Sequence, residues 1–402
     1  MSEQGQVEVA PRFPVLDALR AVGALAVLTT HVGFYAGLYD GHGTWGHLLA
    51  RLDVGVALFF VLSGFLLSRP YLARAALGCP HPATGHYLWK RFLRIFPVYV
   101  VAVVLALLLL DENAGLGLRD WLVTLVLGNT FVDPLPPAGL SQMWSLGVEV
   151  TFYLVLPLLM LAATGRGPGL SPRRVVAVLV AMTAVSVWWH LDGAGRADGW
   201  SDGPALQWLP AYLGWFAVGI ALALAHVVQQ TACPSRLAER VLALGREPGV
   251  CWTLVAALML AATTPLAGPV ELAPPTAGES LTKSLLYAAV GGLVVLTGLS
   301  ADPASRFGKV LGSAPARHLG LTSYSLFCLH LLLLDLIAPA LGFELFGGHF
   351  WTLWLLTVAA SLAAAEVAYR LVERPAMRLK RTFPLREARA ATGSATSGTS
   401  DR

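Results

Sequence analysis

The chain has 402 residues, of which 56% are hydrophobic and 13% are charged, and its mean hydropathy is +0.64. A soluble domain carries about 25% charged residues, so this chain lacks the polar surface of a soluble globule, and lipid is the solvent that suits it. The net charge of +4 is spread over short basic clusters, which argues against nucleic-acid binding, and the four cysteines stand far apart, which argues against a disulfide framework or a metal site.

The apolar stretches predict an all-α fold, a polytopic transmembrane bundle of about ten spans. A helix needs about 20 mostly apolar residues to cross the hydrocarbon core of a bilayer. By that length the predicted spans are 16–37, 52–69, 93–110, 143–163, 174–190, 206–228, 250–265, 282–300, 319–341 and 350–371. The stretch 119–131 is too short to cross and is predicted to be an interfacial or re-entrant helix.

Lysine and arginine concentrate in alternate connections, which predicts the orientation. The basic connections are 70–92, 164–173, 229–249, 301–318 and the segment after 371. By the positive-inside rule these lie in the cytoplasm, so both termini are predicted to be cytoplasmic, in a multi-pass protein of the cytoplasmic membrane. The predicted organisation is a cytoplasmic segment at 1–13, one membrane domain at 14–380 and a disordered cytoplasmic tail at 381–402. The polar start shows no basic n-region, so no cleavable signal peptide is expected.

The first predicted span carries ionisable side chains on one stripe. Eleven steps of about 100° bring His31 to within roughly 20° of the face of Arg20, about 16 Å further along the helix, with Asp17 one turn below Arg20. Ionisable groups inside spans are functional candidates. His31 is either a buried histidine bonded to a neighbouring carbonyl or a general base, and Arg20 is either an anchor at the membrane surface or part of the site.

The next two predicted spans contain a Ser63-Gly64 pair and a basic cluster. The pair is explained by close helix packing or by a role for the hydroxyl. The basic cluster, at the expected cytoplasmic edge of the third span, consists of Lys90, Arg91 and Arg94. Topology alone can account for interface arginines, but two guanidinium groups one turn apart also form a clamp for phosphate groups.

Polar residues recur in the fourth, ninth and last predicted spans. Glu149 lies within the fourth span, and a carboxylate in hydrocarbon needs a partner. That partner is either an arginine of another helix or a catalytic histidine that the carboxylate orients. In the ninth span His330 follows Ser323 and Tyr324. The sequence Glu373-Arg374-Pro375 is interpreted as a structural helix stop at the membrane surface, because proline disfavours helix at the preceding residue.

These segments together resemble the acyltransferase-3 family of membrane acyltransferases. The matching segments, in chain order, are LDALR before His31, GVALFFVLSGFLL, RFLRIFPVY, WSLGVEVTFYLVLP, SYSLFCLH and VERP. The resemblance covers roughly residues 13–380. Each segment alone is weakly specific, whereas six in the same order on the expected helices are specific.

The resemblance implies an enzyme that transfers an acyl group, often acetyl, from acyl-coenzyme A to a hydroxyl. It implies that His31 is the catalytic histidine, that Arg20 acts with it and that Glu149 is an active-site carboxylate. It implies donor binding by the basic cluster Lys90, Arg91 and Arg94. Further candidate site residues are Asp17, Ser63, Trp144, Ser145, Tyr153, Tyr324 and His330. No permanently bound cofactor is expected, and acyl-coenzyme A is the donor substrate. Family members acylate cell-envelope glycans and macrolide-like products, which are the two acceptor classes expected here.

Two other classes of function remain open from the residues alone. Buried His, Arg and Glu side chains also form proton relays, so the alternative is a proton-coupled membrane transporter of a small polar substrate. A non-catalytic scaffold is a third possibility. For the enzyme, direct attack of the acceptor on the thioester and an acyl-enzyme on Ser63 or His31 are both compatible with the sequence, and the acceptor could enter from either side of the membrane.

Overall fold

The computed structural model describes residues 13–39, 41–133, 135–167, 169–231, 234–270 and 273–381. Across these ranges every regular element is a helix and no strand occurs, which confirms the predicted all-α class. The α-helices are α1 (Pro14–Tyr35), α2 (Gly43–Ala50), α3 (Gly55–Ala76), α4 (Thr84–Leu109), α5 (Leu118–Leu125), α6 (Asn129–Val132), α7 (Trp144–Thr164), α8 (Pro172–Trp188), α9 (Ala194–Ala197), α10 (Leu209–Val228), α11 (Arg236–Gly245), α12 (Pro248–Ala262), α13 (Ala277–Leu299), α14 (Arg306–Leu311), α15 (Ala314–Ala340), α16 (Phe350–Ala368) and α17 (Arg374–Arg378).

Nine helical segments of the described chain are long and apolar enough to span a membrane. The tenth predicted span, 250–265, is only the 15-residue helix α12, which is preceded by α11 at a bend of 82°. The pair counts as a span only if it is taken as one broken segment, so the predicted number of about ten is confirmed as nine or ten. The predicted stretch 119–131 forms two short helices, α5 and α6, neither of which can cross a bilayer.

The helix ends differ most from the prediction around 70–92, which was wrongly expected to be a loop. Helix α3 continues through Pro70 to Ala76, and α4 already begins at Thr84. Because α4 starts early, Arg91 and Arg94 lie about two turns inside a 26-residue helix and not at its edge. The apolar pattern predicts only the part of each helix that lies in the hydrocarbon core, and helices α3 and α4 are longer than that part.

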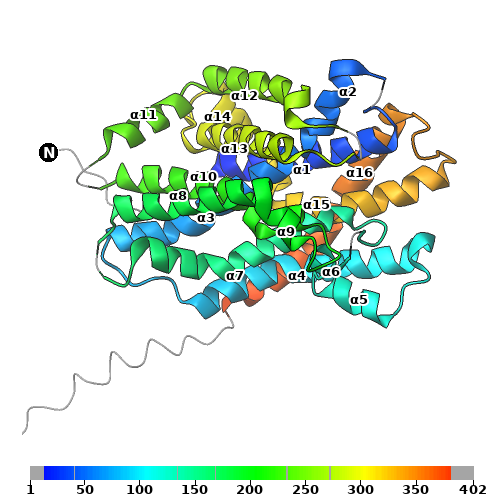
Figure 1. Cartoon of the computed structure of the whole chain (residues 1–402), viewed down its shortest axis with the longest axis horizontal. Coiled ribbons are helices and arrows are strands. Elements are labelled where there is room, and N and C mark those ends of the chain that lie inside the picture. Colours follow the sequence, from blue (N-terminus) through cyan, green and yellow to red (C-terminus); the bar gives the residue numbers. More distant parts are fainter. Residues whose placement is uncertain are drawn as a thin grey trace, which may run out of the picture.

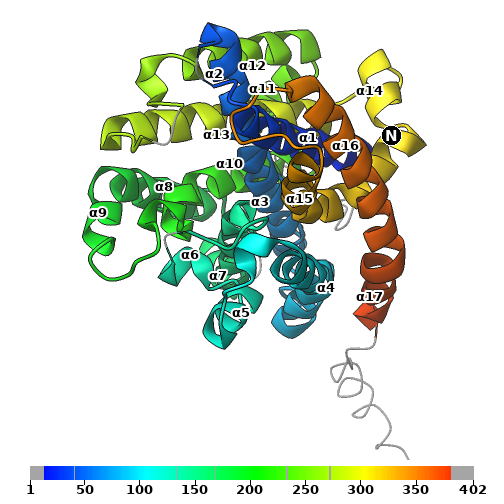
Figure 2. The same ribbon diagram turned by 90° about the vertical axis from the view of Figure 1, so that its right-hand side faces the viewer.

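The long helices run side by side, so the bundle has two ends (Figure 1). We define the basic end as the end of the bundle at which α1, α4, α8 and α15 begin and at which α3, α7 and α10 end. Hydrogen bonds across this end join His81 Nε2 to Thr164 Oγ1 at 2.7 Å, and Trp89 Nε1 donates to the Leu379 carbonyl at 3.3 Å. The first and last described residues therefore lie at the same end. At the opposite end, α2 lies close to α12, and α5 and α6 lie on the other side of the bundle (Figure 2).

The helix does not stop at the Glu373-Arg374-Pro375 segment. The interpretation of this segment as a helix stop was therefore wrong. One π-helical turn, Tyr369–Glu373, connects α16 to α17, and the combined span runs from Phe350 to Arg378. The side chain of Glu373 is fully buried. The wider π turn rotates this carboxylate into the bundle, so the segment contributes to the interior. Residues 1–12 and 382–402, which hold most of the two predicted cytoplasmic segments, lie outside the described residues.

Helices α3 and α10 cross at backbone contact, and this crossing fixes one wall of the interior. A Cβ atom on Gly64 would lie 2.4 Å from the Phe216 carbonyl oxygen, and one on Gly219 would lie 2.1 Å from that of Val61. Only glycine permits such an approach. The close packing inferred for Gly64 is therefore present, and it turns the neighbouring Ser63 toward the inside of the bundle.

Candidate functional site

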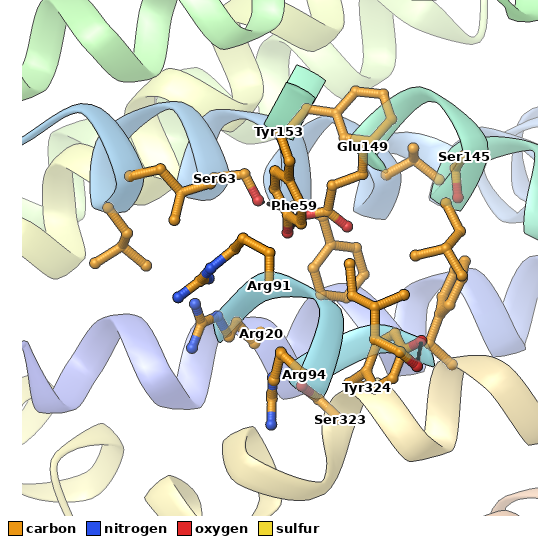
Figure 3. A pocket seen from close by; sticks show the side chains of 17 residues that line it. Arg20, Phe59, Ser63, Arg91, Arg94, Ser145, Glu149, Tyr153, Ser323 and Tyr324 are labelled. Carbon is orange, nitrogen blue, oxygen red and sulfur yellow. Dashed lines mark hydrogen bonds between the residues drawn. The ribbon is translucent and has the colours of Figure 1, made fainter. Parts of the chain in front are cut away.

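The polar residues of the predicted spans are distributed over two cavities. The first, which we call the arginine cavity, is formed by α1, α3, α4, α7 and α15. Its polar lining consists of Arg20, Ser63, Arg91, Arg94, Ser145, Glu149, Tyr153, Ser323 and Tyr324. Figure 3 shows Arg20 and Arg91 toward one side of this cavity and Ser145 at the other. Three arginines from two helices thus face a single space.

The three arginines have different partners. Arg20 contacts Asp17 at 3.5 Å, one turn away on the same helix. Arg91 lies over the Tyr153 ring at 5.9 Å, and its buried Nε–H has no hydrogen-bond acceptor among the described residues. An unsatisfied buried guanidinium donor is costly, and Arg91 therefore has hydrogen-bonding capacity that the described residues leave unused.

Arg94 is held by an ion pair that the sequence analysis missed. Its guanidinium pairs with the carboxylate of Glu373, which also accepts a hydrogen bond from Ser325 Oγ at 2.9 Å. The Arg94 guanidinium lies 5.7 Å from the centre of the Tyr324 ring, and the Tyr324 hydroxyl donates to the Ile95 carbonyl at 2.8 Å. Arg94 therefore joins three helices and presents only part of its charge to the cavity.

A fourth cation lies close to these arginines at the basic end. Burial lowers the pKa of Lys380, and the positive charges of Arg91, Arg94 and Lys90 lower it further. A shift of this origin in the pKa of Lys380 indicates that its ammonium lies near these three cations. Lys380, from the far end of the chain, is thus placed beside the predicted cluster Lys90, Arg91 and Arg94.

Glu149 lies in the arginine cavity and not beside His31. It accepts hydrogen bonds from Ser63 Oγ and from Tyr153 OH, the latter at 2.6 Å. Neither of the two partners proposed from the sequence, an arginine or a histidine, forms a hydrogen bond or an ion pair with Glu149 among the described residues. The hydrogen bonds from two hydroxyl groups stabilise the carboxylate inside the bundle.

The second space, which we call the histidine cavity, lies toward the opposite end of the bundle. Its polar and aromatic lining includes Thr30, His31, Phe34, Tyr39, Arg51, Asp53, Gln142, Trp144 and Lys283. His31 lies about one turn before the end of α1. The structure therefore separates the two members of the predicted Arg20–His31 stripe, one in each cavity.

His31 is paired with His330. The two facing ring nitrogens, Nδ1 of His31 and Nε2 of His330, lie 3.1 Å apart, and Nδ1 of His330 lies 2.8 Å from the Phe327 carbonyl. A carbonyl only accepts, so Nδ1 of His330 carries the proton and its Nε2 is an acceptor when the ring is neutral. His31 then donates from Nδ1, which leaves the lone pair of its Nε2 available as a base.

The two cavities adjoin. Val56 and Phe327 line both of them, and Phe327 packs edge-on against Phe59 with ring centres 5.8 Å apart. These apolar side chains therefore lie where the two cavities meet.

The structure also locates the remaining candidates and adds residues that the sequence analysis did not select. Trp144 lines the histidine cavity, whereas Ser145, Tyr153 and Tyr324 line the arginine cavity. The additional residues are Asp53, Gln142, Lys283, Glu373 and Lys380. Lys283 and Glu373 are charged residues at the border of a predicted span, which is the signal that could have identified them. Nothing in the sequence distinguished Asp53 and Gln142 from ordinary polar residues near the start of a helix.

Comparison with known proteins shows the family to which the chain belongs. The family model described as "Acyltransferase domain" matches residues 13–370. The chain is 27% identical to nodulation protein 10 of Rhizobium leguminosarum bv. viciae over 92% of its own length and 95% of that protein. It is 24% identical to the peptidoglycan O-acetyltransferase OatA of Listeria monocytogenes and 26% identical to the putative peptidoglycan O-acetyltransferase YrhL of Bacillus subtilis.

The alignments with the two peptidoglycan enzymes cover 90% of this chain but only 55% and 54% of those proteins, so the chain spans about half of their length. No solved structure matches it. The family match extends over nearly the whole chain, and the described helices that could cross a membrane fall almost entirely within it. The chain therefore belongs to the acyltransferase-3 family and is a multi-pass membrane acyltransferase.

Proposed function

We propose that this protein transfers an acyl group, normally acetyl, from acyl-coenzyme A to a hydroxyl of a carbohydrate, a glycan or a glycosylated natural product. The observation that carries the proposal is the position of His31. It is paired with His330 so that Nε2 is available as a base, in a cavity that adjoins a second one lined by three arginines. A base beside an anion-binding space is what transfer from an acyl-coenzyme A requires.

The donor binds with its phosphates at the basic end. Arg20 and Arg91 supply cationic donors inside the arginine cavity, and Lys90 and Lys380 add charge beside it. Coenzyme A is made in the cytosol, so this assignment agrees with the predicted cytoplasmic location of the basic end. The thioester arm extends past Phe327 and Val56 toward His31, over the roughly 16 Å that eleven helical residues span.

In the proposed reaction Nε2 of His31 takes the proton of the acceptor hydroxyl. The hydroxyl oxygen attacks the thioester carbonyl, the carbon–sulfur bond breaks, and the coenzyme A thiolate receives the proton from the imidazolium. An ester and free coenzyme A are formed, so atoms and charge balance without a metal ion. General base catalysis of this kind contributes about 10²–10⁴-fold in rate. His330 holds the tautomer and orientation of His31.

The acceptor class rests on the relatives. Two of them are named as peptidoglycan O-acetyltransferases, one of these as a putative enzyme, which supports a hydroxyl of a glycan as the acceptor. A glycosylated macrolide presents the same kind of hydroxyl and remains within the proposal. Membership of the acyltransferase family disfavours the transporter that the sequence alone left open.

The test is turnover of radiolabelled acetyl-coenzyme A by the detergent-purified protein, with His31→Ala compared with the wild type. We expect release of coenzyme A by the wild type, at least 10²-fold slower release by the variant, and unchanged donor binding. His318→Ala is the matched control, because His318 is half-exposed, pairs with Glu366 on α16 and lines neither cavity. Full activity of His31→Ala, or no binding and no cleavage of any acyl-coenzyme A by the wild type, would overturn the proposal.

A further inference from the structure

We infer that the part of the histidine cavity around Asp53 and Lys283 is the acceptor subsite and that it selects a saccharide ring. The inference rests on the proposed function, because it assigns the second substrate of that reaction. His31 lines the same cavity as these two residues, so a hydroxyl bound there lies next to the proposed base.

Asp53 and Lys283 form a polar site that other side chains support. Lys283 Nζ on α13 lies 2.7 Å from Asp53 Oδ2, and the Tyr287 hydroxyl donates to the other carboxylate oxygen. A carboxylate has about four lone-pair positions, of which these contacts use two, and an ammonium has three donors, of which one is used. The side chains of Asp53 and Lys283 are 39% and 32% exposed, so the unused positions are accessible from the cavity. Adjacent acceptors and donors of this kind match vicinal hydroxyl groups.

A third polar group points to a ligand that donates hydrogen bonds. Gln142 lines the cavity and is 98% buried, and its Oε1 accepts no hydrogen bond from any described residue. Its Nε2 donates to the Gly139 and Cys328 carbonyls at 3.3 Å, which fixes the amide orientation. A buried amide oxygen without a donor costs free energy, and a hydroxyl of a bound ligand would satisfy it.

The nearby arginine does not add an anion site to this cavity. Arg51 is 2% exposed, and it donates to the carbonyl oxygens of Ala262, Ala267 and Gly268. These bonds hold the segment after α12 against α2, and they occupy the guanidinium. What remains for a ligand is one carboxylate, one ammonium and one amide oxygen.

Aromatic rings complete the subsite. Phe34, Tyr39 and Trp144 line the same space, with Phe34 and Tyr39 5.7 Å apart and Trp144 5.3 Å from Tyr212. A ligand pocket typically combines apolar and aromatic walls with a few placed polar groups. A saccharide ring, which has an apolar C–H face and a polar edge, fits this lining better than a linear aliphatic alcohol does.

The experiment measures transfer of radiolabelled acetyl groups by the full chain to four acceptors. They are an N-acetylglucosamine tetrasaccharide, a glycosylated macrolide, the sugar-free aglycone of that macrolide, and 1-octanol. Wild type is compared with Asp53→Asn and Lys283→Gln. The matched control is Asp192→Asn, which removes an exposed carboxylate that pairs with Arg196 outside both cavities.

We expect acylation of a sugar-bearing acceptor, no acylation of the aglycone or of octanol, and a KM for the acceptor at least tenfold higher in both cavity variants. The KM for acetyl-coenzyme A and the melting temperature should stay within about twofold and a few degrees of wild type, as in the control. Unchanged acceptor KM, transfer to octanol or the aglycone, or consumption of donor without acylation of either sugar-bearing probe would overturn the subsite. If wild type neither binds nor cleaves any acyl-coenzyme A, the proposed function itself fails, and the inference with it.

Discussion

Nδ1 of His31 on α1 lies 3.1 Å from Nε2 of His330 on α15, although 299 residues separate the two in the chain. The contact exists because α1 and α15 cross closely, with Gly320 placed against the Asp17 carbonyl, where any Cβ atom would overlap it. His330 is itself fixed by the Phe327 carbonyl. Among the described residues, this chain of hydrogen bonds favours the tautomer of His31 that carries its proton on Nδ1, with Nε2 as the acceptor nitrogen.

Removing the acceptor nitrogen of His330 should slow the chemical step. We expect His330→Phe, which keeps the ring volume, to lower kcat by about 10²-fold while the KM for acetyl-coenzyme A changes little, because misorientation of a general base affects the transition state. Steady-state kinetics with labelled donor measure both constants. The pH–rate profile of the variant should also shift, since the free base no longer has its partner. A variant with wild-type kcat and profile would show that the contact is only structural.

Arg91 should dominate donor affinity. We expect Arg91→Gln to raise the dissociation constant for acetyl-coenzyme A about tenfold or more, and Arg91→Lys to raise it less, because lysine keeps the charge but not the planar fork. Binding of wild type should weaken with added salt, and the Gln variant should depend less on salt. Isothermal titration at several salt concentrations measures these effects. Equal affinity in all three proteins would remove Arg91 from the donor site.

Arg94 and Glu373 should act as a structural pair. Glu373 is completely buried, so Arg94→Ala leaves an unpaired buried carboxylate and should destabilise the protein by about 3–5 kcal/mol. The double variant Arg94→Met with Glu373→Leu replaces both charges by apolar groups and should recover most of that loss. Thermal unfolding in detergent measures the order of stability. A double variant less stable than Arg94→Ala would contradict the pairing argument.

The basic end should face the cytoplasm. Cys79 is exposed in the connection between α3 and α4 at this end. In a variant whose other three cysteines are replaced by serine, we expect a membrane-impermeant maleimide to label Cys79 only after cells are permeabilised. A cysteine at Trp200, which is 85% exposed at the opposite end, should be labelled in intact cells. The reverse pattern would invert the topology and the proposed side of donor entry.

Local features of the sequence were sufficient for the fold class and for part of the site. The length of each apolar run decides whether a helix can cross the bilayer, and an ionisable residue inside such a run stands out because burial of charge is costly. These two facts identified the spans, the stripe of Arg20 and His31, and Glu149 within its span. Helix ends were less well determined, since α4 begins nine residues before its apolar core and α12 is shorter than its apolar run suggested.

Which charges meet was decided only by the tertiary structure. The pairs His31–His330, Arg94–Glu373 and Asp53–Lys283 each join helices far apart in the chain, and a sequence does not reveal which faces of two helices touch. Arg20 and His31 lie on one helix, and Phe327 from another helix, α15, lines both of the cavities into which they are separated. The sequence alone thus determined a membrane bundle with costly polar groups inside it. Packing decided how those groups are shared between the arginine cavity and the histidine cavity, because the partner of a buried charge is set by contacts between helices and not by the sequence around it.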